Sequence, residues 1–287
     1  MWPLTGGCHH AFDCTKYLEK CIDCPLLHRK RDMLFCKFQF EEKYRIFSKY
    51  SNLKIIAPST WLFHLASTSL LFKNKQLIHI PNLCDINIFK PMGKGWAKRL
   101  FNLSESKKLI LFGAATGGMG NIYKGWEYLQ KAILHLSTSS YEAVIFGEYN
   151  KTVEKQLPIK CNFIGKLYDE YSLSVLYNAA DVFVTPSLAD NFPNTILESL
   201  SCGTPVVAFN VGGIPDLIMH KSNGYLAHYK DCEDLKKGIE WCVSQYSIQE
   251  VCRSSIIKKY SPSLIIEKHK KLMYGKSEKT EEKGDEF

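Results

Sequence analysis

Residues 185–210 read TPSLADNFPNTILESLSCGTPVVAFN, and their pattern indicates a strand, a loop, a helix and a second strand. An apolar strand ends at Thr185, a short polar loop follows, a helix begins near Asn194, and another apolar strand comes after Gly203. The free N–H groups and the dipole at the start of a helix attract anions. Asp190 before this helix and Glu198 within it can accept hydrogen bonds from hydroxyl groups. Phosphate on the amides and hydroxyls on the carboxylates together describe a sugar nucleotide.

The composition is that of a folded globular protein. The chain has 287 residues, 45% of them hydrophobic, which is enough for one or two domains with a sizeable core. It contains no apolar run as long as a membrane span and no charged-then-apolar signal segment. We therefore expect a soluble protein of the cytoplasm.

Part of the formal net charge of +8 lies in residues 26–50, which hold seven basic and three acidic side chains. A solvated helix face is one explanation for this basic segment. Contact with an acidic ligand or with an anionic membrane, as a peripheral protein at the inner face of the plasma membrane, is the other. The chain shows no nucleic-acid-binding motif, so no nucleic-acid partner is expected.

Four of the eleven cysteines fall close together near the N-terminus. They are Cys8, Cys14, Cys21 and Cys24. Four thiolates at this spacing can hold a structural zinc ion tetrahedrally, with His9 or His10 as a substitute ligand. Four reduced thiols in a loop packed on a helix are the alternative. The other cysteines lie mostly in apolar surroundings, which favours buried thiols over a disulfide framework.

Apolar periodicity predicts few elements before residue 92. Helices are expected at 26–48 and 60–66, with Pro58 and Ser59 capping the second, and strands at 53–57 and 76–80. Residues 81–91 are bounded by prolines and read as a linker. Because two parallel strands rarely form a stable sheet alone, we expect them to join another sheet or the chain to lack a preceding portion.

From residue 108 onward, strands and helices alternate regularly. Strands are expected at 109–113, 142–147, 161–165, 181–185, 205–209 and 223–227, and helices at 124–136, 170–180, 194–202, 212–218, 232–245, 248–259 and 262–274. This alternation predicts an α/β fold with a doubly wound parallel sheet of the Rossmann type. Its ligand is expected at the carboxyl ends of the strands.

A glycine-rich loop follows the first of these strands. It contains Gly113, Gly117, Gly118 and Gly120, and Lys124 stands next at the expected helix start. A diphosphate there would meet backbone amides and one ammonium group. A surface loop with a solvated lysine is the alternative.

Glu198 is flanked by Ile196, Leu197 and Leu200, which must be buried. This setting favours a carboxylate in a cleft over one on a solvated helix face. Gly212 and Gly213 follow another strand and can approach a ligand closely.

Residues 186–216, PSLADNFPNTILESLSCGTPVVAFNVGGIPD, resemble the donor-binding segment of the retaining glycosyltransferases of family 4 (group 1). ADVFVTPS at 180–187 supports this resemblance, and IPNLCDINIFKP at 80–91 resembles the interdomain linker of that family. The opening MWPLTGGCHH and the CIDC at 21–24 look like a subgroup that acts in bacterial exopolysaccharide or O-antigen assembly. The resemblance extends to about residue 274 and implies a GT-B fold with two Rossmann-like domains.

The resemblance also implies a domain division. It places a truncated acceptor-side domain at 1–86, a nucleotide-sugar donor-binding domain at 87–255, and a C-terminal helix at 256–275 that packs back toward the N-terminal part. The charged tail at 276–287 lacks apolar anchors and is expected to be disordered.

The resemblance implies roles for residues 190–198 and for Lys124, which precedes them in the sequence. Glu198 would hold the ribose hydroxyls, Asp190 the hydroxyls of the donor sugar, and Lys124 would neutralise the departing diphosphate, so that catalysis needs no metal. The donor-binding set is Gly117, Gly118, Asn191, Phe192, Pro193, Asn194, Thr195 and Gly213. Within this set, residues 191–193 would line the sugar with backbone amides, and residues 194 and 195 would lie near the diphosphate.

The chain departs from the family pattern at three places. Asp190 stands where the family usually has Glu, which retracts the carboxylate by on the order of 1.5 Å. Residues 114–121 lack the Arg or Lys that often precedes Lys124. In the related subgroup a His-Asp pair that supplies a catalytic histidine comes just before Met-Trp-Pro, where this chain begins, so little transferase activity is expected from the chain alone.

The resulting expectation is a hexosyltransferase (EC 2.4) in cell-surface polysaccharide biosynthesis. It would move a sugar from a UDP- or GDP-linked donor to a glycan or lipid-linked glycan acceptor, with retention at the anomeric carbon. One alternative is a catalytically impaired donor-domain fragment, or a split-gene subunit, that binds nucleotide sugar but needs a partner. A zinc-stabilised interaction module at residues 1–25 is another.

Overall fold

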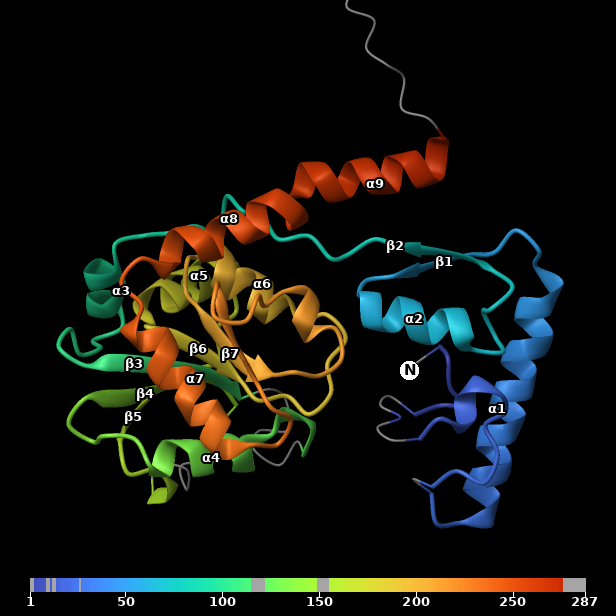
Figure 1. Cartoon of the computed structure of the whole chain (residues 1–287), viewed down its shortest axis with the longest axis horizontal. Helices are drawn as coiled ribbons and strands as arrows, with labels where there is room; N and C mark the ends of the chain where they lie inside the picture. The colour runs from blue at the N-terminus through green and yellow to red at the C-terminus, as the bar shows by residue number, and fades with distance from the viewer. Residues whose placement is uncertain are drawn as a thin grey trace, which may run out of the picture.

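The computed structural model describes residues 3–8, 11, 14–25, 27–114, 122–148 and 155–275. Within them the chain forms two separate parallel sheets, joined by the segment that follows the second strand (Figure 1). None of the helices in this described part of the chain is long and apolar enough to cross a membrane.

The larger sheet is a doubly wound parallel sheet, which confirms the predicted fold class. Its strands are β3 (Lys108–Ala114), β4 (Tyr141–Gly147), β5 (Lys160–Gly165), β6 (Val182–Thr185), β7 (Val206–Phe209) and β8 (Gly224–Ala227). They lie in the order β5-β4-β3-β6-β7-β8, and every neighbouring pair is parallel. The chain therefore winds outward from β3 in one direction and from β6 in the other. The switch point between these two strands is where such sheets bind ligands.

Helices cover both faces of this sheet. One face carries α4 (Trp126–Leu134) and α7 (Cys232–Ser244), and the other carries α3 (Lys94–Leu100), α5 (Glu170–Ala179), α6 (Asn194–Ser201) and α8 (Ile248–Tyr260). Side chains of β3 alternate between the two cores, with Leu109 and Leu111 on the α5 and α6 side and Ile110 and Phe112 on the α4 side. This strand is thus buried on both faces, as its unbroken apolar sequence requires.

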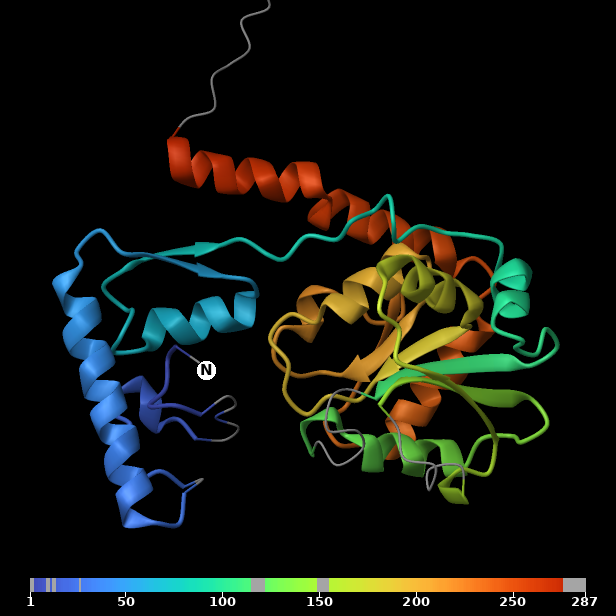
Figure 2. The ribbon, with the colours of Figure 1, turned by 180° about the vertical axis from the view of Figure 1, so that it is seen from behind.

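The N-terminal part is built around a two-stranded sheet. It contains a 3₁₀ turn (Lys16–Leu18), α1 (Lys30–Lys49), β1 (Lys54–Ala57), α2 (Thr60–Thr68) and β2 (Gln76–His79). Among the described residues β1 and β2 pair only with each other, and both views place these elements to one side of the larger sheet (Figure 2). Their small core includes Leu4, Tyr17, Phe40 and Phe72.

Polar contacts tie the connecting segment to the C-terminal helices. The guanidinium of Arg253 on α8 donates to the carbonyl oxygens of Phe89 (2.6 Å) and Ile86 (3.0 Å). Helix α9 (Pro262–Tyr274) then runs back past the smaller sheet, where Lys54 Nζ lies 3.4 Å from the carbonyl oxygen of Leu272 (Figure 1). The domain boundaries at residues 86 and 255 stay predictions, and residues 276–287 lie outside the described part.

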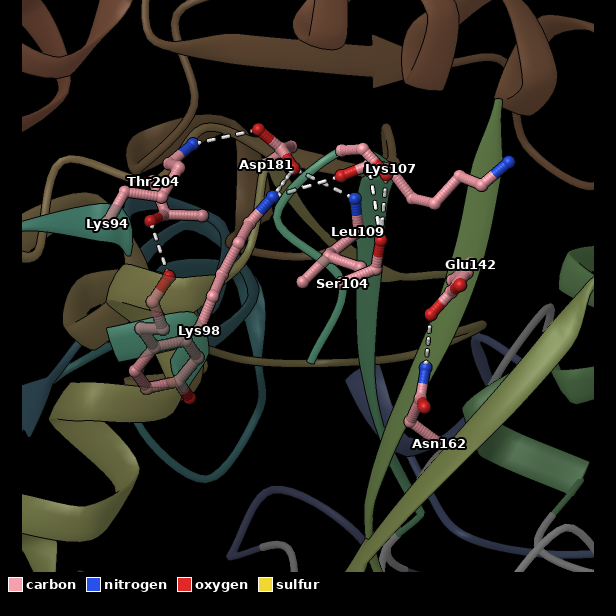
Figure 3. A network of polar contacts seen from close by, with 11 residues as sticks. Lys94, Lys98, Ser104, Lys107, Leu109, Glu142, Asn162, Asp181 and Thr204 are labelled. Carbon is pink, nitrogen blue, oxygen red and sulfur yellow. Dashed lines mark hydrogen bonds and ion pairs between the residues drawn. The ribbon is translucent and has the colours of Figure 1, made fainter. Parts of the chain in front are cut away.

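Helix α3 was not predicted from the sequence, and its contacts show why. Its segment KGWAKRL is short and basic, but Lys98 is buried with its ammonium 3.2 Å from Asp181 Oδ2. The other oxygen of Asp181 lies 3.0 Å from Lys94 Nζ, and the Leu109 amide donates to Oδ2 at 2.8 Å (Figure 3). This network lies at the amino ends of β3 and β6, opposite the carboxyl ends of the strands.

Candidate active site

The predicted phosphate and sugar groups meet at the switch point. Lys124 comes from the 3₁₀ turn Ile122–Lys124 after β3, and Asp190 comes from the loop after β6. The ammonium of Lys124 lies 3.6 Å from Asp190 Oδ2, and the two side chains are 40% and 20% exposed. This distance makes an ion pair that is too long for a direct hydrogen bond, so the ammonium stays accessible to another anion.

Backbone contacts hold the same two loops together. The amide of Leu188 donates to the carbonyl oxygen of Tyr123 at 2.8 Å. Gly125 has a left-handed φ of 63°, and a Cβ there would overlap the carbonyl oxygen of Pro186. Only glycine fits this close approach. The left-handed residue also separates Lys124 from α4, which begins at Trp126, so the expectation that Lys124 opens the helix is wrong.

A third loop, after β7, closes on Asp190 from the other side. The amide of Gly213 donates to the carbonyl oxygen of Asp190 at 3.2 Å. Gly212 has a φ of 59°, and a Cβ there would overlap the same carbonyl group. The close approach expected of these glycines is therefore to the Asp190 loop.

The start of α2 reaches this site from the N-terminal part. Ser59 is fully buried and donates its hydroxyl to Asn191 Oδ1 at 2.6 Å, while it accepts the Leu62 amide as the cap of α2. Asp216 Oδ2 accepts the Thr60 amide at 2.7 Å. The sequence indicated only the capping role of Ser59, because its partner lies 132 residues away.

The helix-entry residues of the donor-binding set point in different directions. Phe192 is 5% exposed and packs edge-on against Tyr260 at 5.6 Å, so its side chain belongs to the core. Asn194 is exposed at the start of α6, and its Oδ1 accepts a hydrogen bond from Asn82 at 2.9 Å. Thr195 is half-buried. The expectation of a backbone amide at Pro193 is wrong because proline has no N–H.

Glu198 lies on α6, half-buried beneath α5. Its Oε2 accepts a hydrogen bond of 3.0 Å from the hydroxyl of Tyr177, a residue that the sequence did not single out. Burial raises the pKa of Glu198 to about 7, against the opposing effect of the Tyr177 hydroxyl. Ile196, Leu197 and Leu200 are fully buried, as predicted.

The N-terminal cysteines are close enough to influence one another. Cys21 and Cys24 are buried, Cys8 and Cys14 are half-buried, and all eleven cysteines are free thiols. Burial and neighbouring thiols raise the pKa of Cys8 and of Cys21. Over residues 3–8, 11, 14–25, 27–114, 122–148 and 155–275, no three His, Cys, Asp or Glu side chains stand at ligand spacing for a metal. The zinc ion stays a prediction that metal analysis of the purified chain would test.

Some predicted residues lie outside the described part of the chain. These are Gly117, Gly118 and Gly120 of the glycine-rich loop and the two histidines His9 and His10. Their proposed contacts therefore stay predictions.

Comparisons with known proteins bear on the larger sheet. Residues 110–245, just under half of the chain, match the family model of group 1 glycosyl transferases. An uncharacterised glycosyltransferase of Methanocaldococcus jannaschii is 30% identical over 57% of this chain and 44% of its own length. The sulfoquinovosyl transferase of Arabidopsis thaliana is 33% identical over 47% of this chain and 26% of its own length. The chain thus spans less than half of these curated relatives.

Solved structures show the same fold. Sucrose-phosphate synthase from Thermosynechococcus elongatus has a TM-score of 0.68 at 21% identity, covering 81% of this chain and 60% of its own. Anabaena HepE in complex with UDP-glucose has a TM-score of 0.66 at 19% identity, covering 80% and 66%. These proteins have the GT-B architecture. The α/β fold is therefore of GT-B type, and its residues 110–245 are similar to the group 1 glycosyl transferases.

Proposed function

We propose that this chain is a retaining family 4 glycosyltransferase that moves a hexose-like unit from a nucleotide sugar to a glycan acceptor. The convergence of Lys124 and Asp190 at the switch point carries the proposal, because it sets a cation beside a hydroxyl acceptor. Glu198 on α6, next along the chain, adds a second carboxylate. The proposed donor-binding domain spans residues 87–255.

Lys124 supplies the positive charge for the leaving group in this proposal. Cleavage of the glycosidic bond leaves negative charge on the nucleoside diphosphate, and a preorganised cation lowers the energy of that state. Since Lys124 is 40% exposed and 3.6 Å from Asp190, a bound diphosphate can share its ammonium. Catalysis would then need no metal ion.

The two carboxylates, Asp190 and Glu198, bind different parts of the donor in this proposal. Asp190 accepts hydrogen bonds from the sugar hydroxyls, and Glu198 accepts them from the ribose. The carbonyl oxygen of Asp190 is held by Gly213, so its backbone is already ordered for binding. Such ordering favours one orientation of the sugar, which any stereospecific transfer requires.

Calorimetric titration with UDP, UDP-glucose and a GDP-sugar tests donor binding. We expect heat with at least one nucleotide, and UDP is the first choice because HepE has been seen with UDP-glucose. The matched variants are Lys124→Ala, which should weaken binding, and Lys258→Ala on the exposed side of α8, which should not. Folded protein that gives no heat with any of these ligands would contradict the proposal.

The acceptor class rests on the resemblance of residues 1–24 to a polysaccharide-assembly subgroup. We propose a glycan or lipid-linked glycan acceptor in cell-surface polysaccharide biosynthesis. Incubation of donor and candidate acceptors, followed by proton NMR of the new anomeric centre, would identify the product and its configuration. The alternative of an impaired donor-domain fragment is not favoured by the comparisons, and turnover in this assay would exclude it.

A lipid-linked acceptor would suit peripheral contact with a membrane. Helix α1 exposes Leu34 (66%), Phe35 (60%) and Phe38 (56%) beside the basic side chains of residues 26–50. Apolar and basic groups on one helix bind anionic lipid surfaces. Co-sedimentation with vesicles of anionic and of neutral lipid would test this contact, and equal recovery with both would count against it.

A further inference from the structure

We propose that Tyr177 is a positioning residue of the donor site, whose hydroxyl holds one oxygen of the Glu198 carboxylate and so orients the other toward the ribose. This inference rests on the proposed function, because it takes Glu198 as a nucleotide ligand. Nothing in the sequence motif includes Tyr177, which lies on α5 rather than on the donor-binding stretch.

The ring of Tyr177 is fixed by its surroundings. The residue is fully buried, and its ring packs edge-on against Phe183 (5.4 Å between centroids), Phe89 (6.3 Å) and Phe146 (6.4 Å). Its carbonyl oxygen accepts the hydroxyl of Thr204 at 2.7 Å. Because neither the ring nor the backbone is free to move, the hydroxyl is held at one place in the site.

That place is 3.0 Å from Oε2 of Glu198. A carboxylate has two oxygen atoms, and this bond engages one of them. Oε1 is therefore the oxygen that the geometry leaves to a ribose hydroxyl. Burial, together with the neighbouring Glu198, raises the pKa of Tyr177 well above its ordinary value, so the phenol remains a donor at every pH at which the protein is assayed.

The charge on Glu198 depends on the same bond. The titratable groups that face Glu198 are Tyr177 and Glu170 from α5, Cys84 from the connecting segment and Cys202 from the end of its own helix. Burial is the largest influence on the pKa of Glu198, the Tyr177 hydroxyl opposes it and Glu170 adds to it, and the resulting pKa is about 7. Removal of the hydroxyl should therefore raise this pKa and shift Glu198 further toward its protonated form at neutral pH.

Tyr177→Phe tests the inference while keeping the packed ring. We expect UDP to bind about tenfold more weakly to this variant at pH 7, from loss of one hydrogen bond to a charged group. The midpoint of the pH dependence of UDP affinity should move to higher pH in the variant. The difference in UDP affinity between variant and parent should become smaller near pH 9. Tyr225→Phe is the matched control, since it removes a 2.8 Å bond from a tyrosine to Asp234 on the opposite face of the sheet, under α7 rather than α6.

A ligand-free measurement separates this inference from the proposed function. Carbon-13 NMR of the glutamate carboxyl groups should show one group titrating near pH 7, absent in Glu198→Gln, with a higher midpoint in Tyr177→Phe. In the unmodified protein the Cζ signal of one tyrosine should shift with the same midpoint, because the Tyr177 hydroxyl senses the ionisation of Glu198. This measurement tests the contact even if Tyr177→Phe does not fold. If the Glu198 carboxyl group titrates with the same midpoint in the parent and in Tyr177→Phe, and both bind UDP equally, the proposed role of Tyr177 is wrong. Failure of the folded, unmodified protein to bind UDP, UDP-glucose or the GDP-sugar would overturn the proposed function instead.

Discussion

Lys124 Nζ and Asp190 Oδ2 lie 3.6 Å apart across the switch point of the larger sheet. The pair joins the turn after β3 to the loop after β6, and the bond from the Leu188 amide to Tyr123 holds the two backbones in the same register. An exposed ion pair of this length contributes little to stability. Its position therefore bears on ligand binding more than on folding.

Lys124→Ala should weaken binding of UDP by about tenfold or more while leaving uridine binding nearly unchanged. The reason is that the ammonium meets the diphosphate, and uridine has none. Calorimetry with both ligands measures the difference, and urea denaturation should show a stability change below about 1 kcal/mol. Equal losses for UDP and uridine would mean that Lys124 acts on the fold of the loop.

Asp190→Asn should separate sugar binding from nucleotide binding. The variant keeps an oxygen at the same place but loses the charge that accepts sugar hydroxyls and pairs with Lys124. We expect the affinity for UDP to hold or to rise slightly, since Lys124 is released, while the affinity for UDP-glucose falls by about tenfold from loss of a charged hydrogen-bond acceptor. A variant that binds UDP-glucose as tightly as the parent does would contradict the role of Asp190.

Local pattern predicted the larger sheet because each of its strands is an apolar run between polar turns. The residues that the sequence missed depend on distant partners. Tyr177 reads as one more apolar residue of α5, and only the fold brings it to Glu198. Ser59 reads as a helix cap, and Lys98 reads as a solvated lysine until Asp181 is placed beside it. Spacing along the chain carries no signal for such contacts.

Glu198→Gln should stabilise the protein above pH 7 and weaken nucleotide binding. Burial raises the pKa of Glu198 to about 7 in the folded protein, above its value in the unfolded chain. The folded state then holds the extra proton between about pH 4.5 and pH 7, so the stability falls as pH rises through this window and stays lower above it. Because glutamine carries no charge, the Glu198→Gln variant does not lose this stability as the pH rises.

We expect Glu198→Gln to be more stable than the parent by on the order of 1–3 kcal/mol at pH 8 and equally stable near pH 4.5. Urea denaturation at the two pH values measures this. A parallel loss of UDP affinity would mark Glu198 as a binding residue kept at the expense of stability. Equal stability of variant and parent at pH 8 would mean that the carboxylate is solvated in the folded state.

Asp181→Asn should destabilise the protein without affecting the donor site. Burial alone would raise the pKa of Asp181, but Lys94, the Leu109 amide and Lys98 outweigh it and hold the pKa below its ordinary value. Such a carboxylate contributes stability above its unfolded pKa of about 3.9, and this contribution is lost as pH falls through the lower folded value. Asparagine leaves the buried ammonium of Lys98 without its counter-charge.

The expected loss at pH 7 is about 3–5 kcal/mol, the usual result of removing one partner from a buried pair. Glu105→Gln is the matched control, because it breaks an exposed pair with Arg99 on the same helix and should change stability by less than about 1 kcal/mol. Urea denaturation compares the two variants. Since Asp181 lies at the amino ends of β3 and β6, UDP affinity of the folded Asp181→Asn protein should equal that of the parent, and a lower affinity would mean that this network reaches the carboxyl-end site through the strands (Figure 3).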